Sequence, residues 1–85
     1  MAKDIKMKVT ISKIPDVLIL EPKLHGDSRG YFLETFRASI FKERGIDLRF
    51  VQDNQSRSTQ GTLRGLHYQH AFPQGKLVRV LAGEV

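Results

Sequence analysis

The sequence contains no cysteine among its 85 residues, and this absence excludes two classes of site. Without thiols the chain forms neither disulfides nor thiolate metal sites, which suits a reducing compartment. It also lacks a long apolar run, so we expect no membrane span and no membrane partner. The first eight residues carry charges throughout and have no apolar stretch of the kind that a signal peptide needs. We therefore expect a cytoplasmic protein.

A cluster of basic residues is also missing, although basic residues are in excess. The chain has 14 Lys and Arg against 9 Asp and Glu, a formal net charge of +5. Dispersed positive charge helps to attract an anionic small molecule, and it attracts nucleic acid equally well. However, the aromatic residues, chiefly Phe, do not alternate with the basic ones as a base-stacking platform requires. We expect no nucleic-acid partner.

The residues present favour one small domain built mainly of strands. Alternation of apolar and polar residues predicts strands over 8–14, 17–21, 31–36, 47–54, 62–69 and 76–82. One helix is predicted over 37–44, with Ile40, Phe41 and Ile46 as apolar anchors and Gly45 as its C-terminal stop. We expect a single all-β domain over residues 1–85, with residues 1–7 as a disordered extension.

The most informative stretch is Gly61–Gln69, in which Arg64 and His67 stand three residues apart. A regular strand would point these two side chains to opposite faces, whereas a bend at Gly65 would bring them together. A cation beside a neutral-pH proton carrier suits removal of a proton next to the carbonyl of an anionic substrate. A hydrogen-bonded structural role for His67 is the alternative that this pattern leaves open.

Polar residues elsewhere are open to two interpretations. Gln52, Asp53 and Asn54 follow an apolar pair and suit sugar hydroxyls or a base edge, but an Asx-type turn explains them too. The stretch 26–34 is interpreted as a polar turn that leads into a strand. Turn chemistry accounts for Gly26, Asp27 and Gly30 without any function, and it leaves Arg29 and Glu34 undecided.

A metal site is considered because His67 and His70 are close in sequence. Positions three apart in a strand face opposite ways, and the next Glu in the sequence is Glu84. We expect no metal and no other cofactor.

Four runs, taken in their order and spacing, resemble the dTDP-4-dehydrorhamnose 3,5-epimerase family. They are DSRGYF at 27–32, FVQDN at 50–54, LRGLHYQ at 63–69 and QGKLV at 74–78. The resemblance extends from about Ile14 onward and covers only the amino-terminal half or so of the family. It implies a cupin-type double-sheet jelly roll with one short helix, assembled as a homodimer with strand exchange. A jelly roll has about eight strands, so we expect this one to be incomplete.

The resemblance also implies roles for individual residues. His67 matches the catalytic base, and Lys76 matches the cation that stabilises the enolate. The positions matching substrate-binding residues are Arg29, Glu34, Gln52, Asp53, Asn54 and Arg64. Neither Tyr31 nor Tyr68 matches the catalytic acid, a tyrosine that we expect beyond residue 85 together with a second histidine and the carboxylate that orients the base.

The implied reaction is epimerisation at C3 and C5 of a dTDP-4-keto-6-deoxyhexose in dTDP-rhamnose biosynthesis. Both carbons lie next to the C4 carbonyl, so one base serves both. Two alternatives remain, a non-catalytic cupin-like module that binds sugar nucleotides and a sugar-nucleotide 3,4-ketoisomerase. The run 52–54 beside 64–67 favours the epimerase. We expect residues 1–85 alone, which lack the acid, to show no turnover.

Overall fold

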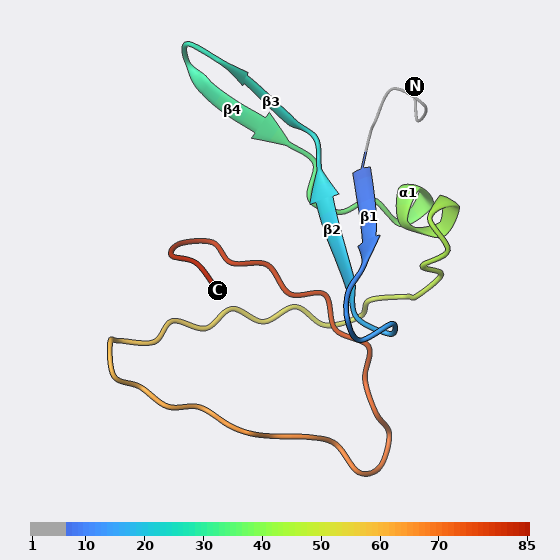
Figure 1. Ribbon diagram of the computed structural model, residues 1–85, viewed down its shortest axis with the longest axis vertical. Helices are drawn as coiled ribbons and strands as arrows, with labels where there is room; N and C mark the ends of the chain where they lie inside the picture. The colour runs from blue at the N-terminus through green and yellow to red at the C-terminus, as the bar shows by residue number, and fades with distance from the viewer. Residues whose placement is uncertain (1–6) are drawn as a thin grey trace. The chain divides into compact units, whose positions relative to one another are not determined.

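The computed structural model describes residues 7–85, which fall into two compact units, residues 7–49 and Phe50–Val85. We call them the amino-terminal unit and the carboxy-terminal unit. The regular elements of the described residues all lie in the amino-terminal unit (Figure 1): β1 Met7–Ile11, β2 Leu18–Pro22, β3 Leu24–Asp27, β4 Gly30–Leu33 and α1 Ala38–Glu43. These small sheets with one short helix agree with the expected all-β class. The expected extension over 1–7 lies outside the described residues except for Met7, which begins β1.

The β1–β2 pair has a predominantly apolar face because its residues alternate. The strands are antiparallel, with Met7 opposite Pro22 and Val9 opposite Leu20. Successive residues of a strand point to opposite faces, so these four share one face. Met7 is only 6% exposed, and the other three are half-buried. This part of the face is therefore largely shielded from solvent.

The connection between β1 and β2 shortens the first strand relative to the prediction. The strand ends at Ile11, not at residue 14, because hydrogen bonds turn the chain there. The Ser12 amide donates to the Val17 carbonyl at 3.2 Å, and the Val17 amide donates to the Ile14 carbonyl at 2.8 Å. The predicted strand over 17–21 is confirmed as β2, shifted by one residue.

Strand β3 is an element that the sequence did not predict. We expected a polar turn from Gly26 onward, because Gly and Asp are typical turn residues. Instead Gly26 and Asp27 pair with β4, and the turn is confined to two residues, Ser28 and Arg29. Gly30 resumes the ladder with φ of 137°, a conformation that favours glycine. β4 ends at Leu33, short of the predicted residue 36, because Leu33 pairs with the first residue of β3.

Helix α1 confirms the predicted helix and its anchors. Ile40 and Phe41 are each 3% exposed. Gly45 is the expected stop: its φ is 84°, and its amide donates to the Lys42 carbonyl at 3.0 Å. The Ile46 amide donates to the Phe41 carbonyl at 2.8 Å. Together these bonds form a Schellman motif, which satisfies carbonyls at the helix end.

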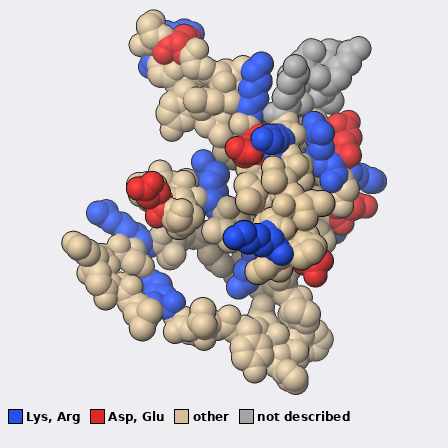
Figure 2. Space-filling view, in the orientation of Figure 1, with Lys and Arg blue, Asp and Glu red and all other residues tan. Residues whose placement is uncertain are grey.

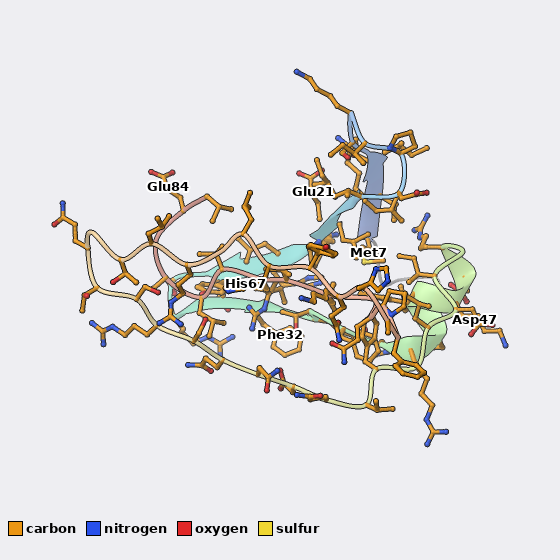
Figure 3. All side chains as sticks on the ribbon, turned by 90° about the horizontal axis from the view of Figure 1, so that it is seen from below. Met7, Glu21, Phe32, Asp47, His67 and Glu84 are labelled. Atoms are coloured by element: carbon orange, nitrogen blue, oxygen red, sulfur yellow. The ribbon has the colours of Figure 1, made fainter. Side chains whose placement is uncertain are left out.

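The carboxy-terminal unit differs most from the prediction. The strands predicted over 47–54, 62–69 and 76–82 do not form in the described residues, which are irregular from residue 44 onward. Every residue of 51–85 is exposed, and the side chains stand on an extended trace (Figure 3). A strand needs a neighbour to receive its backbone hydrogen bonds. The alternating pattern predicts such a strand without supplying the neighbour.

We expect Gly45→Ala to destabilise the protein by about 1–2 kcal/mol, the usual cost of a left-handed residue that has a Cβ. Space is not the cause, since a Cβ at this position would meet no atom within 4 Å. Gly26→Ala is the matched control, because Gly26 has an ordinary φ and its Cβ would lie 3.7 Å from the Gly30 carbonyl oxygen. Urea denaturation measures both changes, and equal losses for the two variants would contradict this account.

Candidate functional site

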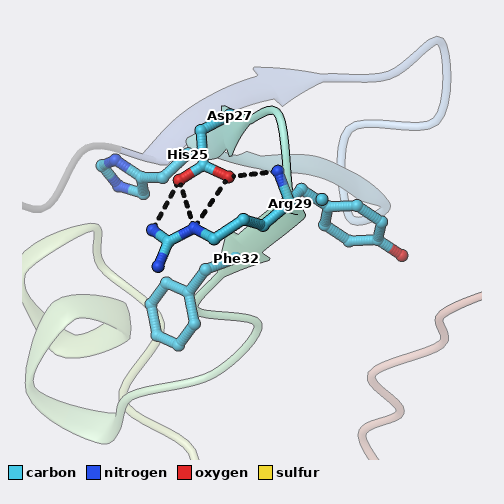
Figure 4. A pocket seen from close by; sticks show the side chains of 6 residues that line it. His25, Asp27, Arg29 and Phe32 are labelled. Carbon is cyan, nitrogen blue, oxygen red and sulfur yellow. Dashed lines mark hydrogen bonds and ion pairs between the residues drawn. The ribbon is translucent and has the colours of Figure 1, made fainter.

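The turn of the β3–β4 hairpin carries an open hollow of about 250 Å³ (Figure 4). Its lining residues are His25, Asp27, Arg29, Gly30, Tyr31 and Phe32. The strand register sets this arrangement, because His25 pairs directly opposite Phe32. Their ring centroids are 6.5 Å apart. The hollow therefore combines aromatic surface with one carboxylate and one guanidinium group.

Asp27 and Arg29 form the best-defined polar contact of this hollow. Arg29 Nη2 lies 2.6 Å from Asp27 Oδ2, and Nε lies 3.2 Å from the same oxygen. The Arg29 amide also donates to Asp27 Oδ1 at 2.8 Å. Acidic and basic side chains lie side by side at this end of the hairpin in the space-filling view (Figure 2). One carboxylate thus holds both the turn and the guanidinium group.

These bonds shift the pKa of both groups. The Arg29 side chain, and then its amide, lower the pKa of the Asp27 carboxyl group by bonding to its charged form. The carboxylate in turn raises the pKa of Arg29. Both shifts favour the charged forms that make the ion pair.

Glu34, which follows β4, has a partner that the sequence did not point to. Arg37 Nη2 donates to Glu34 Oε2 at 2.7 Å, across a spacing of three residues. Both side chains are partly shielded, with exposed fractions of 43% for Arg37 and 27% for Glu34. Glu34 is therefore held at the start of the segment that leads into α1.

In the carboxy-terminal unit, Arg64 closes a turn. The Thr62 amide donates to the Thr59 carbonyl at 3.2 Å, where the chain reverses direction (Figure 1). Arg64 Nε donates to Ser58 Oγ at 2.7 Å, and its Nη2 donates to the Arg57 carbonyl at 3.1 Å. Arg64 is thus directed toward the preceding residues and not toward His67.

The remaining predicted residues of this unit are exposed and lie outside any helix or strand. Gln52 Nε2 approaches Asn54 Oδ1 at 3.5 Å. Gly65 does bend the chain, with φ of 106°, and a Cβ there would lie 3.9 Å from His67 Nδ1. Within the described residues, neither His67 nor Lys76 has a side-chain hydrogen bond or ion pair, with each other or with another group.

Residues 7–85 contain neither a cluster of metal ligands nor a membrane-spanning helix. In that range, no three or more His, Cys, Asp or Glu side chains gather where they could hold a metal ion. The helix in this range, α1, has six residues, and no helix there is long and apolar enough to cross a membrane.

Comparison with known proteins identifies the family. The family model described as dTDP-4-dehydrorhamnose 3,5-epimerase matches residues 11–85. The chain belongs to this family. It is 57% identical over 81 residues to the dTDP-4-dehydrorhamnose 3,5-epimerase of Shigella flexneri, covering 93% of this chain and 45% of that protein. It is 54% identical over 74 residues to the protein of the same name from Methanothermobacter thermautotrophicus, and this match covers 87% of this chain and 40% of that protein. The resemblance drawn from the four sequence runs is confirmed.

The match to the dTDP-4-dehydrorhamnose 3,5-epimerase family is partial in length. The chain spans less than half the length of the curated relatives named above. No solved structure matches it.

Two residues of this family member were not singled out from the sequence. Asp27 was explained by turn chemistry alone, although an acceptor two residues before an arginine is a signal for a local ion pair. Arg37 was assigned only to the helix start, although a spacing of three residues after Glu34 allows side-chain contact. Both act on residues that the sequence did single out.

We expect the Asp27 carboxyl group to titrate below the ordinary aspartate pKa of about 3.9. Because the folded pKa is lowered, the Asp27–Arg29 pair stabilises the hairpin at neutral pH. That stabilisation is lost as the pH falls below about 4 and through the lowered pKa. NMR titration of the Asp27 carboxyl carbon measures this value.

Arg29→Gln should raise the Asp27 pKa, because the change removes the guanidinium group. It keeps the backbone amide of residue 29, which donates to Asp27 Oδ1. Lys8→Gln is the control, since Lys8 lies on β1 and is 3.9 Å from Glu21. An Asp27 pKa that is the same in the wild type and in Arg29→Gln would refute the pairing.

Proposed function

We propose that the full-length protein epimerises C3 and C5 of dTDP-4-dehydro-6-deoxyglucose, giving dTDP-4-dehydrorhamnose for dTDP-rhamnose biosynthesis. The observation that carries this proposal is the family match over residues 11–85. The relatives in Shigella flexneri and Methanothermobacter thermautotrophicus, more than half identical over the matched residues, support it. The activity is that of an isomerase, and its substrate is a sugar nucleotide.

The proposed mechanism uses one base for two carbons. His67 removes the proton from C3 and from C5 in separate rounds, since the C4 carbonyl acidifies both positions. Lys76 stabilises the negative charge that develops on the carbonyl oxygen as the enolate forms. An acid on the opposite face of the sugar returns a proton and inverts the carbon. We assign this acid to a tyrosine outside residues 1–85. No cofactor enters this scheme.

Substrate binding is assigned to cations and amides. Arg29 and Arg64 suit the diphosphate because guanidinium groups donate two parallel hydrogen bonds to phosphate oxygens. Glu34 suits a hydroxyl donor. The polar run 52–54 supplies both donors and acceptors for the sugar or the base.

We also propose that the complete protein is a single jelly-roll domain of the cupin type that forms a homodimer with strand exchange. The exposed edges of two-stranded sheets support this, because such pairs are only marginally stable alone. Apolar side chains on β1, β2 and β3 support it as well: Ile11, Ile19 and Leu24 are 69%, 49% and 58% exposed. Further strands would cover these surfaces.

We expect His67→Asn in the full-length protein to abolish solvent deuterium incorporation at both C3 and C5. The amide keeps a polar group of similar size but cannot accept the proton. NMR of the substrate in D₂O reports exchange at each carbon separately. His70→Asn is the matched control, because it removes an imidazole three residues away that has no assigned role.

The outcomes separate the alternatives. Exchange at either carbon near the wild-type rate would remove His67 from its role. Wild-type protein that binds dTDP without any exchange would indicate a non-catalytic module. Migration of the carbonyl from C4 to C3 would indicate a 3,4-ketoisomerase.

We expect Arg29→Ala and Arg64→Ala each to weaken dTDP binding by about tenfold or more, since a hydrogen bond to a charged group contributes about 1.5–3 kcal/mol. Arg44→Ala is the control for net charge, because Arg44 caps α1 through its backbone amide. Calorimetry measures the dissociation constants. Unchanged affinity in both test variants would count against the assigned binding residues.

A further inference from the structure

We propose that Asp27 is a positioning residue for Arg29, holding the guanidinium group so that its free edge meets the anionic part of the ligand. This inference rests on the proposed function through the binding role of Arg29. The Arg29 side chain is 88% exposed, so packing does not fix its direction. Within the described residues, its ion pair is with Asp27, two residues earlier in the same hairpin.

The geometry leaves the right donors available. A guanidinium group has five N–H donors, one on Nε and two on each Nη. Asp27 contacts the edge formed by Nε and Nη2. The outer edge, formed by Nη1 and the second N–H of Nη2, is left for a ligand. Two parallel N–H groups at that edge match the oxygens of a phosphate.

Holding the side chain in advance favours binding. A long, exposed arginine loses rotamer freedom when a ligand captures it, and that loss weakens affinity. In this hairpin Asp27 has already restricted the side chain before a ligand arrives. The carboxylate also reduces the local positive charge, but charge effects between exposed groups are weak and screened by salt.

Two other roles of Asp27 make different predictions. If Asp27 only shapes the turn, then Asp27→Asn is harmless, because an amide oxygen still accepts the bond from the Arg29 amide. If Asp27 competes with the ligand for the guanidinium group, then Asp27→Asn strengthens binding. Positioning predicts weaker binding, and only while Arg29 is present.

The experiment is a double-mutant cycle on the full-length protein with dTDP as the probe. Calorimetry measures dTDP affinity in the wild type, Asp27→Asn, Arg29→Ala and the double variant. We expect Asp27→Asn to weaken binding about five- to tenfold, a typical coupling between residues in contact. The double variant should bind no more weakly than Arg29→Ala. Asp16→Asn, in the β1–β2 connection, is the control for loss of one negative charge.

A second readout does not depend on ligand binding. The Arg29 Nε–H proton should exchange with solvent more slowly in the wild type than in Asp27→Asn, as seen by NMR. The Leu33 amide signal, at the other end of the β3–β4 ladder, should keep its position in Asp27→Asn if the hairpin is intact. This separates a lost guanidinium contact from a lost fold.

Each alternative result overturns the proposal in a recognisable way. Unchanged or tighter dTDP binding in Asp27→Asn assigns Asp27 to the turn alone or to competition. An equal loss with and without Arg29 shows that Asp27 acts through another group. If Arg29→Ala binds dTDP normally, Asp27 has nothing to position. The epimerase activity itself is then judged separately by deuterium exchange at C3 and C5.

Discussion

The antiparallel pairing of Asp27 with Gly30 is the constraint on which the polar site of the amino-terminal unit depends. It closes the β3–β4 ladder with only Ser28 and Arg29 in the turn. It thereby places the Asp27 carboxylate 2.8 Å from the Arg29 amide nitrogen. A slip of one residue would turn every side chain of the strand to the other face. Hairpin register, not burial, therefore organises the hollow.

The apolar face of the β1–β2 pair sets a second constraint. Ile11 and Leu18 pair opposite each other. Ile11 follows Val9 by two positions, so this pair belongs to the same face as Met7 and Val9. Yet they are 69% and 38% exposed, whereas Met7 is 6% exposed. Only the end of this face near Met7 is thus well covered. The exposed apolar side chains of Ile11 and Leu18 favour contact with additional protein segments.

The sequence predicted the elements whose causes are local. Helix α1 follows from the apolar anchors Ile40 and Phe41 and from Gly45, whose left-handed conformation stops the helix. β1 and β2 follow from alternation. By contrast, β3 contains Gly26 and Asp27, which disfavour a strand, and it exists because β4 offers a partner.

Strands of the carboxy-terminal unit were wrongly predicted for the converse reason. The mainly apolar run between 76 and 82 favours a strand, as the alternation of β1 does, but pairing is a property of two segments and not of one. A similar limit applies to the site. The sequence and its resemblance singled out Arg29 and Glu34, but not Asp27 and Arg37, because a side-chain partner is set by backbone geometry.

Local partners also distinguish the proposed binding residues from the proposed base. Arg29, Glu34 and Arg64 each bond to a group within seven residues along the chain. His67 is exposed, and the described residues provide no partner for its imidazole. A general base acts only when it is held within hydrogen-bond reach of the proton that it takes. The proposed binding residues Arg29 and Arg64 are therefore oriented by neighbouring sequence, whereas the described residues do not orient the proposed base. Changes in a local pair should accordingly alter ligand affinity first, and changes to distant packing should alter turnover first.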